Sequence, residues 1–182
     1  MKQEEKYTGE NEKWLQFNKR IVIRRNEDDP NSPAYLIRRT LISLGKYFSM
    51  KYHQILQSDD ECSHDHPWSF VTLILKGGYY EWTPISQKEN GIVLDKRYNV
   101  HINQYEVKRW HGAGSIMYRP AKWCHRLELR EELGFDQKKY VATLTPIPAH
   151  TFVLTFKVVR NWGFFTTKGW IAWEGYNKKR DC

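Results

Sequence analysis

Two histidines separated by one residue are the side chains of this chain best placed to do chemistry. His64 and His66 lie in the heptapeptide HDHPWSF (64–70). Residues i and i+2 of a β-strand project from the same face, so both imidazoles would reach one point in space. Neutral imidazole binds divalent iron, manganese, zinc, nickel and copper. The spacing therefore indicates part of a metal site, and the alternative is two histidines that only hydrogen-bond to the backbone where a strand begins.

A second segment, GSIMYRPAKWCHRLEL (114–129), contains a further histidine, His125. Polar and apolar positions alternate over its last five residues. In a strand this alternation places Leu127 and Leu129 on the face of His125, with Arg126 and Glu128 on the opposite face. The segment thus predicts a strand whose apolar face includes a histidine.

Short strands are the elements that would position these residues. Runs rich in β-branched and aromatic residues alternate with turn sequences such as KGG (76–78) and HGAG (111–114), which is typical of an all-β sandwich or barrel. Glycine supplies the positive φ of tight turns, so we expect KGG to form a hairpin. Glu81 would then lie on the strand paired with the one after His66. Three roles are open for Glu81: a metal ligand, a hydrogen-bond partner of a ligand, or a solvent-facing residue. The sequence leaves them open because a register shift of one residue reverses the face on which Glu81 lies.

Helical patterns occur only before residue 50. The segment EKWLQFNKRI (12–21) has apolar residues at helical spacing. In SPAYLIRRTLISLGKYF (32–48), Ser32 and Pro33 suit the N-cap and the first helical position. We therefore expect one or two short N-terminal helical segments in an otherwise all-β chain.

Taken together, the two histidine segments resemble the paired motifs of the cupin superfamily. The resemblance implies a double-stranded β-helix, or jelly roll, with a divalent metal ion inside the barrel. It also implies that the histidines of both motifs hold the ion, so that His64, His66 and His125 are the expected ligands. The residues that match the two motifs in spacing are His64, His66, Gly77, Gly114, Pro120 and His125.

The chain departs from the cupin motifs at three positions. Phe70 stands where the first motif usually has a glutamate, and Lys122 and Leu129 replace a glycine and an asparagine of the second. An all-histidine set remains, with Glu81 as the candidate replacement carboxylate. Such a set suits iron, manganese, zinc or nickel and leaves positions open for water, oxygen or substrate.

A finer resemblance is to small cupin-like proteins of phages and prophages, a group without an assigned activity. It rests on the order of the segments HDHPWSF, GGYYEW, YRPAKWCHRLEL and VVRNWGFFTTKGW. Residues 130–150 look longer than the usual link in that group and are expected to cover the barrel. The resemblance adds Arg119, Tyr79, His53 and Arg160 as candidates for catalysis or substrate binding, and Trp68, Phe70 and Trp162 as residues that pack the site.

Several of these candidates have a plainer alternative. Arg119 or Arg160 would hold a carboxylate or phosphate by a two-pronged contact, or would simply pair with an acidic side chain of the sheet. His53 is more simply a satisfied histidine of the core or rim. The aromatic tail (161–176) is expected to pack over the barrel mouth, and the alternative is a surface that stacks nucleic-acid bases.

The length of 182 residues suits one domain. We divide it into an N-terminal extension (1–50), a barrel (51–165) and an aromatic and basic tail (166–182). The net charge of +8 is spread along the chain, which favours a generally basic surface and permits an anionic partner. A homodimer is an expectation from the cupin resemblance alone.

The widely spaced Cys62, Cys124 and Cys182 are expected to be reduced, with Cys62 a buried thiol or a soft zinc ligand. His101, His111 and His150 lie beside turns and are expected at the surface. The N-terminus lacks an apolar signal segment, and no apolar run approaches the ~18 residues of a transmembrane helix. These features predict a cytoplasmic protein with no membrane segment, in a bacterial host if a phage encodes it.

Three functions fit the sequence. The first is a mononuclear metalloenzyme that acts on a small anionic substrate, oxygenase-like, with an iron-dependent dioxygenase as one form of it. The second is a non-catalytic cupin that binds a nucleotide or another small anion, for instance in phage–host conflict. The third is a structural protein associated with nucleic acid, which only the net charge supports.

Overall fold

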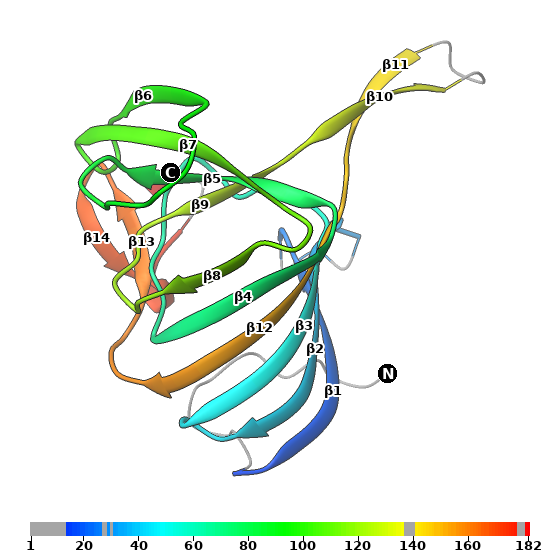
Figure 1. The fold of residues 1–182 in the computed structure, drawn as a ribbon, viewed down its shortest axis with the longest axis vertical. Helices are drawn as coiled ribbons and strands as arrows, with labels where there is room; N and C mark the ends of the chain where they lie inside the picture. The colour runs from blue at the N-terminus through cyan, green and yellow to red at the C-terminus, as the bar shows by residue number, and fades with distance from the viewer. Residues whose placement is uncertain (1–13, 27–28, 30, 137–140, 178–180) are drawn as a thin grey trace.

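A computed structural model describes residues 14–26, 29, 31–136, 141–177 and 181–182. Its strands form two antiparallel sheets that lie opposite each other, together with two separate hairpins (Figure 1). The first sheet has the order β1 (Gln16–Arg24), β2 (Ala34–Leu44), β3 (Phe48–Ile55), β12 (Ala149–Val158), β4 (Trp68–Lys76) and β8 (Ile116–Arg119). The second has the order β6 (Asp95–Asn99), β7 (Gln104–Gly112), β5 (Gly78–Pro84) and β9 (Arg126–Leu129). The hairpins are β10 (Glu131–Asp136) with β11 (Val141–Pro146) and β13 (Gly163–Thr166) with β14 (Gly169–Ala172), followed by the short 3-10 helix η1 (Trp173–Gly175).

The chain passes from one sheet to the other between β4 and β5, again between β7 and β8, and back between β8 and β9. Repeated crossing between two antiparallel sheets is consistent with a jelly roll. The prediction of an all-β chain is therefore confirmed.

The expected N-terminal helices are wrong. The segments at 12–21 and 32–48 supply β1 and β2, which pair with each other in antiparallel register, apart from residues 12 and 13, which lie outside the described residues. β-Branched residues such as Ile21 and Val22 prefer pleated, extended backbone. Val22 pairs with Ile37 and Ile23 with Leu36, so long-range pairing overrides the helical spacing. The N-terminal segment thereby extends the sheet that contains β3.

The hairpin expected at KGG is also wrong, because β4 and β5 belong to different sheets. Gly77 and Gly78 instead form the corner where the chain changes sheets, with φ of +71° and +152°. A Cβ atom at Gly77 would lie 2.5 Å from the carbonyl oxygen of Pro148, and one at Gly78 would lie 2.5 Å from that of His111. Glycine is therefore required here by close backbone approach as well as by φ.

The apolar core lies between the two sheets. Tyr79 on β5 and Leu129 on β9 contribute to it from the four-stranded sheet. The other buried members come from the six-stranded sheet and are Leu36, Ile55, Ile74, Met117 and Ala149. Burial of these side chains stabilises the sandwich and fixes the register of the strands that carry the candidate site.

The segment expected to cover the barrel, residues 130–150, instead contains the β10–β11 hairpin. Figure 1 shows this hairpin extending away from both sheets. Leu133 and Leu144 lie opposite each other on it and are exposed. No helix in the described part of the chain is long and apolar enough to cross a membrane.

Candidate metal centre

Three segments bring His64, His66 and His125 together. His64 and His125 form an isolated antiparallel bridge in which each backbone N–H donates to the other's carbonyl, at 2.8 and 3.0 Å. His64 also bridges to Phe164 on its other side. His66 is held by its backbone N–H, which donates to the carbonyl of Ala121 at 3.1 Å. The His-x-His segment therefore precedes β4 and is fixed by the segments around β9 and β13.

The three imidazoles, here called the three-histidine cluster, converge on one point. Each offers a ring nitrogen within 4.8 Å of the other two. Nε2 of His66 lies 2.9 Å from Nε2 of His125. Two nitrogens that are each about 2.0–2.1 Å from the same ion lie roughly 3 Å apart, so this separation fits a shared metal ion. The donor set fits a borderline divalent metal.

Aromatic rings surround the three-histidine cluster. The ring of Phe70 lies 4.7 Å from that of His66, centroid to centroid. Phe164 and Trp162 lie 5.8 and 6.4 Å from the ring of His64. Phe70, which stands at the usual glutamate position, thus faces the cluster and gives it an apolar wall.

The surroundings keep the imidazoles of His64 and His66 uncharged, because both have a lowered pKa. Burial lowers the pKa of His64 to about 4, although Asp59, whose Oδ2 lies 3.9 Å from Nδ1, opposes the shift. Burial and the neighbouring His64 and His125 hold the pKa of His66 well below its ordinary value. Neutral imidazole is the form that binds metal. His64 and His66 are therefore in the metal-binding form at neutral pH.

Glu81 lies behind His125 and outside the group of three nitrogens. Its Oε1 is 2.5 Å from Nδ1 of His125. A carboxylate there accepts the Nδ1 proton, which fixes the tautomer and leaves Nε2 directed at the cluster. Of the three alternatives for Glu81, the described geometry matches a hydrogen-bond partner of a ligand.

Glu81 also forms the centre of a second group, here called the carboxylate cluster. Arg119 donates to it through Nε at 3.1 Å and also through Nη2, and Trp123 Nε1 donates at 3.0 Å. His111 Nε2 lies 3.2 Å from Oε2, and Arg119 Nη2 also bonds Glu89 at 2.6 Å. Burial alone would raise the pKa of Glu81, but its contacts with His111, His125 and Arg119 hold that pKa well below its usual range.

Asp65, between the two motif histidines, faces the other way and holds the C-terminal hairpin. It is almost fully buried. It accepts from the backbone N–H of Gly163 at 2.9 Å, from Trp170 Nε1 at 3.1 Å and from Arg160. This places Trp162 against His64 and pairs Arg160 with a carboxylate.

The remaining candidates occupy different surroundings. Tyr79 is a core residue whose ring lies 6.1 Å from that of His111. His53 accepts from Arg38 Nε at 3.2 Å, and burial followed by the charge of Arg38 lowers its pKa well below the ordinary value. Trp68 lies under the ammonium group of Lys51, which is 4.3 Å from the ring centroid.

Two expectations about cysteine and histidine are wrong. Cys62 and Cys182 form a disulfide, and Cys124 is the free, buried cysteine. Their separation of 120 residues leaves no local pattern that would reveal the pairing. His111, expected at the surface, is buried and contacts Glu81, because it lies on an inward-facing position of β7.

The sequence interpretation missed three residues of this region: Asp65, His111 and Arg38. Asp65 carried a signal, because it has the opposite parity to the two motif histidines and so points away from them. Arg38 lies on the same face of β2 as the buried Leu36 and Thr40, but helical spacing in this segment hid that position in the sequence. A hollow of about 310 Å³ lies elsewhere on the protein, and none of the three histidines lines it. Its lining residues are Ser58, Tyr80, Glu128, Leu129, Arg130 and Glu131.

Comparisons with known proteins give similar solved structures. A scan against protein-family models and a search of curated protein sequences found no match. Hydroxypropylphosphonic acid epoxidase from S. wedmorenis is 10% identical with a TM-score of 0.43, over 75% of this chain and 55% of that one. An RmlC-like cupin from Ralstonia eutropha JMP134 is 11% identical with a TM-score of 0.44, over 85% of this chain and 75% of that one. DMSP lyase from Ruegeria pomeroyi DSS-3 is 11% identical with a TM-score of 0.45, over 79% of this chain and 58% of that one. The matched region thus covers little more than half the length of the epoxidase chain and of the lyase chain.

Proposed function

We propose that the protein is a metal-dependent, oxygenase-like enzyme that acts on a small anionic substrate. A mononuclear divalent ion would be held by His64, His66 and His125. The observation that carries the proposal is the convergence of three imidazole nitrogens within 4.8 Å, two of them 2.9 Å apart. Three neutral protein ligands leave coordination positions for exogenous molecules.

Each protein group has a physical role in this proposal. A bound divalent ion would act as a Lewis acid with open positions for oxygen and substrate. Glu81 orients His125 by accepting its Nδ1 proton, and a histidine positioned in this way is a stronger ligand. Phe70, Trp162 and Phe164 exclude water from the centre, which strengthens electrostatic contacts there.

An anionic substrate is favoured by cations on the inner face of the six-stranded sheet. Arg38 contacts His53, and its charge contributes to the lowered pKa of His66, so it acts near the cluster. Lys51 is buried on the same face of β3 as His53. Arg119 and Arg160 are already paired with Glu81 and Asp65. Arg38 therefore joins Arg119 and Arg160, the two arginines indicated by the sequence resemblance, as a candidate for attracting the substrate.

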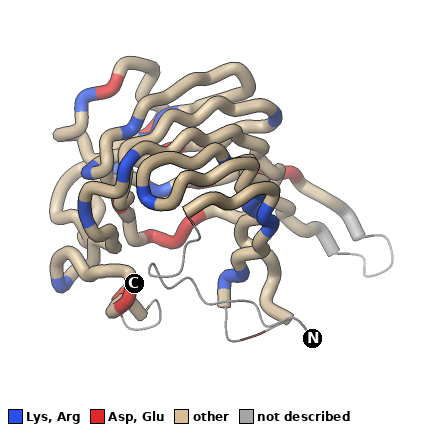
Figure 2. Tube along the Cα trace, turned by 90° about the horizontal axis from the view of Figure 1, so that it is seen from below, with Lys and Arg blue, Asp and Glu red and all other residues tan. Residues whose placement is uncertain are grey.

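The second candidate function is a non-catalytic binder of a small anion, which the same cations favour. The nucleic-acid alternative has less support. Figure 2 shows Lys and Arg of the described residues distributed over several elements. A distribution of that kind favours a generally basic surface over a stripe that follows a phosphate backbone.

Metal analysis of untagged protein, combined with histidine variants, tests the proposal. Single replacement of His64, His66 or His125 by alanine should lower divalent-metal affinity at least tenfold. His150→Ala is the matched control, since His150 bonds Tyr52 away from the cluster and should leave metal content unchanged. Nitric oxide should give an electron-spin signal with the ferrous protein if a position is open. Stoichiometric metal in all three variants would refute the site, and metal that admits no nitric oxide would favour the binder.

A further inference from the structure

The C-terminal residue of the chain lies against the segment that precedes the His-x-His pair. Cys182 forms a disulfide with Cys62, with the Cα atoms 5.8 Å apart. Asp181 is held against the β13–β14 hairpin and the residues after it independently of the sulfur–sulfur bond. It is almost fully buried, accepts from Lys168 Nζ at 3.1 Å and from the Asn177 N–H at 2.9 Å, and its carbonyl contacts Cys62 Sγ. The same hairpin in turn holds the segment of Cys62, because the Phe165 N–H donates to the Ser63 carbonyl at 2.8 Å. Reduction would therefore leave two thiols side by side.

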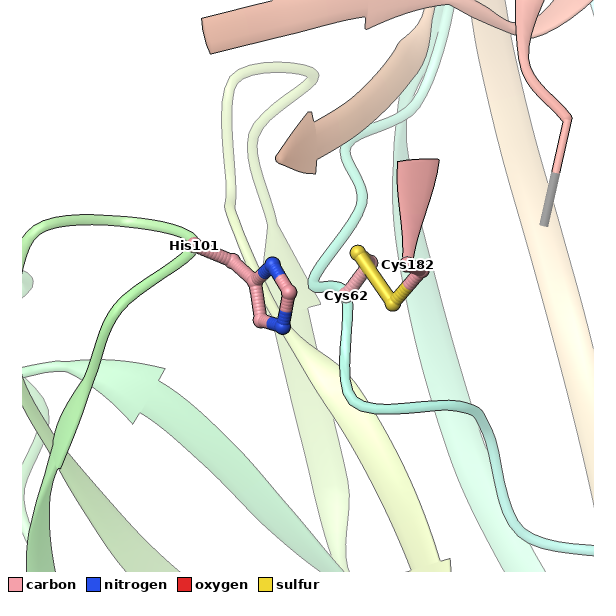
Figure 3. A group of neighbouring side chains, drawn as sticks. All are labelled: Cys62, His101 and Cys182. Atoms are coloured by element: carbon pink, nitrogen blue, oxygen red, sulfur yellow. A yellow bond between two sulfur atoms is a disulfide. The ribbon is translucent and has the colours of Figure 1, made fainter. Parts of the chain in front are cut away.

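His101 faces this pair from the turn between β6 and β7. Figure 3 shows its imidazole directed toward the disulfide. One ring nitrogen and both sulfur atoms lie within 4.8 Å of one another. Nδ1 of His101 is buried and has no hydrogen-bond partner among the described residues. The turn itself is anchored, because Asn99 accepts from the His101 N–H at 2.8 Å and donates to Glu106 at 2.9 Å. A fixed imidazole with an unused nitrogen thus completes a group of three ligands.

Thiolate and imidazole form the characteristic donor set of zinc. Zinc accepts Cys₂His sites with a water in the fourth position, and soft sulfur ligands select it over calcium, magnesium or manganese. The donors differ from those of the three-histidine cluster, with which they share no atom.

We propose that Cys62, Cys182 and His101 form a second, redox-controlled metal site that takes one zinc ion when the disulfide is reduced. Two electrons and two protons from a dithiol convert the disulfide into two thiols, and the dithiol becomes a disulfide. Zinc then binds both sulfurs as thiolates and one imidazole nitrogen, and two protons are released. In the reverse step a small-molecule disulfide accepts the two electrons and two protons and becomes a dithiol, the protein disulfide forms again, and the zinc ion is released. The same residues are therefore a covalent clamp in an oxidising compartment and a zinc clamp in a reducing one.

Cobalt(II) is the probe, because thiolate ligation gives a near-ultraviolet charge-transfer band that a histidine-only site cannot give. The full-length protein is reduced anaerobically with a phosphine, which becomes the phosphine oxide with oxygen from water. The reduced protein should gain one cobalt ion with this band, and zinc should displace it. The oxidised protein should show no band. Circular dichroism checks that the reduced protein is folded; loss of the fold on reduction would overturn the proposal, because the site requires the docked C-terminus.

Variants assign the ligands one by one. Cys182→Ser should abolish the band, and His101→Ala should weaken cobalt affinity at least tenfold. Cys124→Ser and His150→Ala are matched controls that should keep it. The band should also survive in His64→Ala, which separates this site from the three-histidine cluster. Absence of the band in reduced wild-type protein, its persistence in Cys182→Ser, or unchanged affinity in His101→Ala would each refute the assignment.

Discussion

The three-histidine cluster and the carboxylate cluster share one side chain and otherwise differ in how their polar atoms are satisfied. His125 belongs to both, since Nδ1 meets Glu81 and Nε2 meets His66. In the carboxylate cluster, both oxygens of Glu81 have cationic or N–H partners. In the three-histidine cluster, imidazole nitrogens meet one another beside aromatic rings.

This difference separates a structural role from a binding role. A buried carboxylate that is paired with a guanidinium has few free lone pairs for a ligand. Its removal would leave the guanidinium buried without that counter-charge, which is destabilising. Imidazole nitrogens that converge without a charged partner among them can share a divalent cation. We therefore assign positioning to the carboxylate cluster and metal binding to the three-histidine cluster, and the predictions below test that division.

The largest expected effect is on the carboxylate cluster. Glu81→Gln removes the charge that Arg119 faces in the interior, which should lower the free energy of unfolding by about 3–5 kcal/mol, the usual cost of breaking a buried pair. Urea denaturation of metal-free protein measures it. Glu128→Gln is the matched control, because Glu128 pairs with Lys108 at 34% side-chain exposure and should lose about 1 kcal/mol or less. Equal losses in the two variants would contradict the division.

A smaller effect should appear when the pH of metal-free protein is lowered. His64 has a folded-state pKa of about 4 against 6.5 when unfolded, so between these values the unfolded chain binds the extra proton. Stability should be intact above pH 6.5 and fall by about 3 kcal/mol as the pH approaches 4. Denaturation midpoints across this range provide the measurement. His64→Asn should reduce the slope but not abolish it, because the pKa values of His53 and His66 are also lowered; an unchanged slope would show that His64 does not contribute to it.

The smallest predicted effect concerns the apolar wall of the three-histidine cluster. Phe70→Glu places a carboxylate beside His66 and should tighten divalent-metal binding about tenfold, or ~1.4 kcal/mol, because it adds an anionic donor. Calorimetric titration measures the affinity. Phe70→Leu keeps the wall apolar and should leave affinity unchanged. Weaker binding in the folded Phe70→Glu protein would mean that residue 70 does not reach the ion.

The histidines could be predicted from the sequence because strand parity is a local rule. His64 and His66 share parity, so their common direction depends on no distant contact. The resemblance to the paired cupin motifs indicated His125 as the third histidine, and its approach to the other two depends on the bridge between His64 and His125. The all-β class followed from short β-branched runs between turns.

Other features depend on which strands become neighbours, and local patterns do not carry that information. β1 and β2 have helical spacing but are stabilised as strands by pairing with each other. The KGG corner has the glycines of a hairpin, yet the chain changes sheets there. The Cys62–Cys182 bond closes 120 residues, and the interior position of Arg38 depends on the register between β2 and β3.

Asp65 limits how the metal centre could be transferred to another protein scaffold. The residue sits between the two histidines, yet its carboxylate serves the backbone of Gly163 and the side chains of Arg160 and Trp170. The heptapeptide HDHPWSF therefore cannot be transferred alone. In another protein it would bring a buried carboxylate without its three hydrogen-bond donors, and an unpaired buried charge destabilises the host fold. Transfer of the centre would therefore need the heptapeptide, residues 160–170 and the segment from Ala121 to His125, which supplies the third histidine and the backbone partners of the other two.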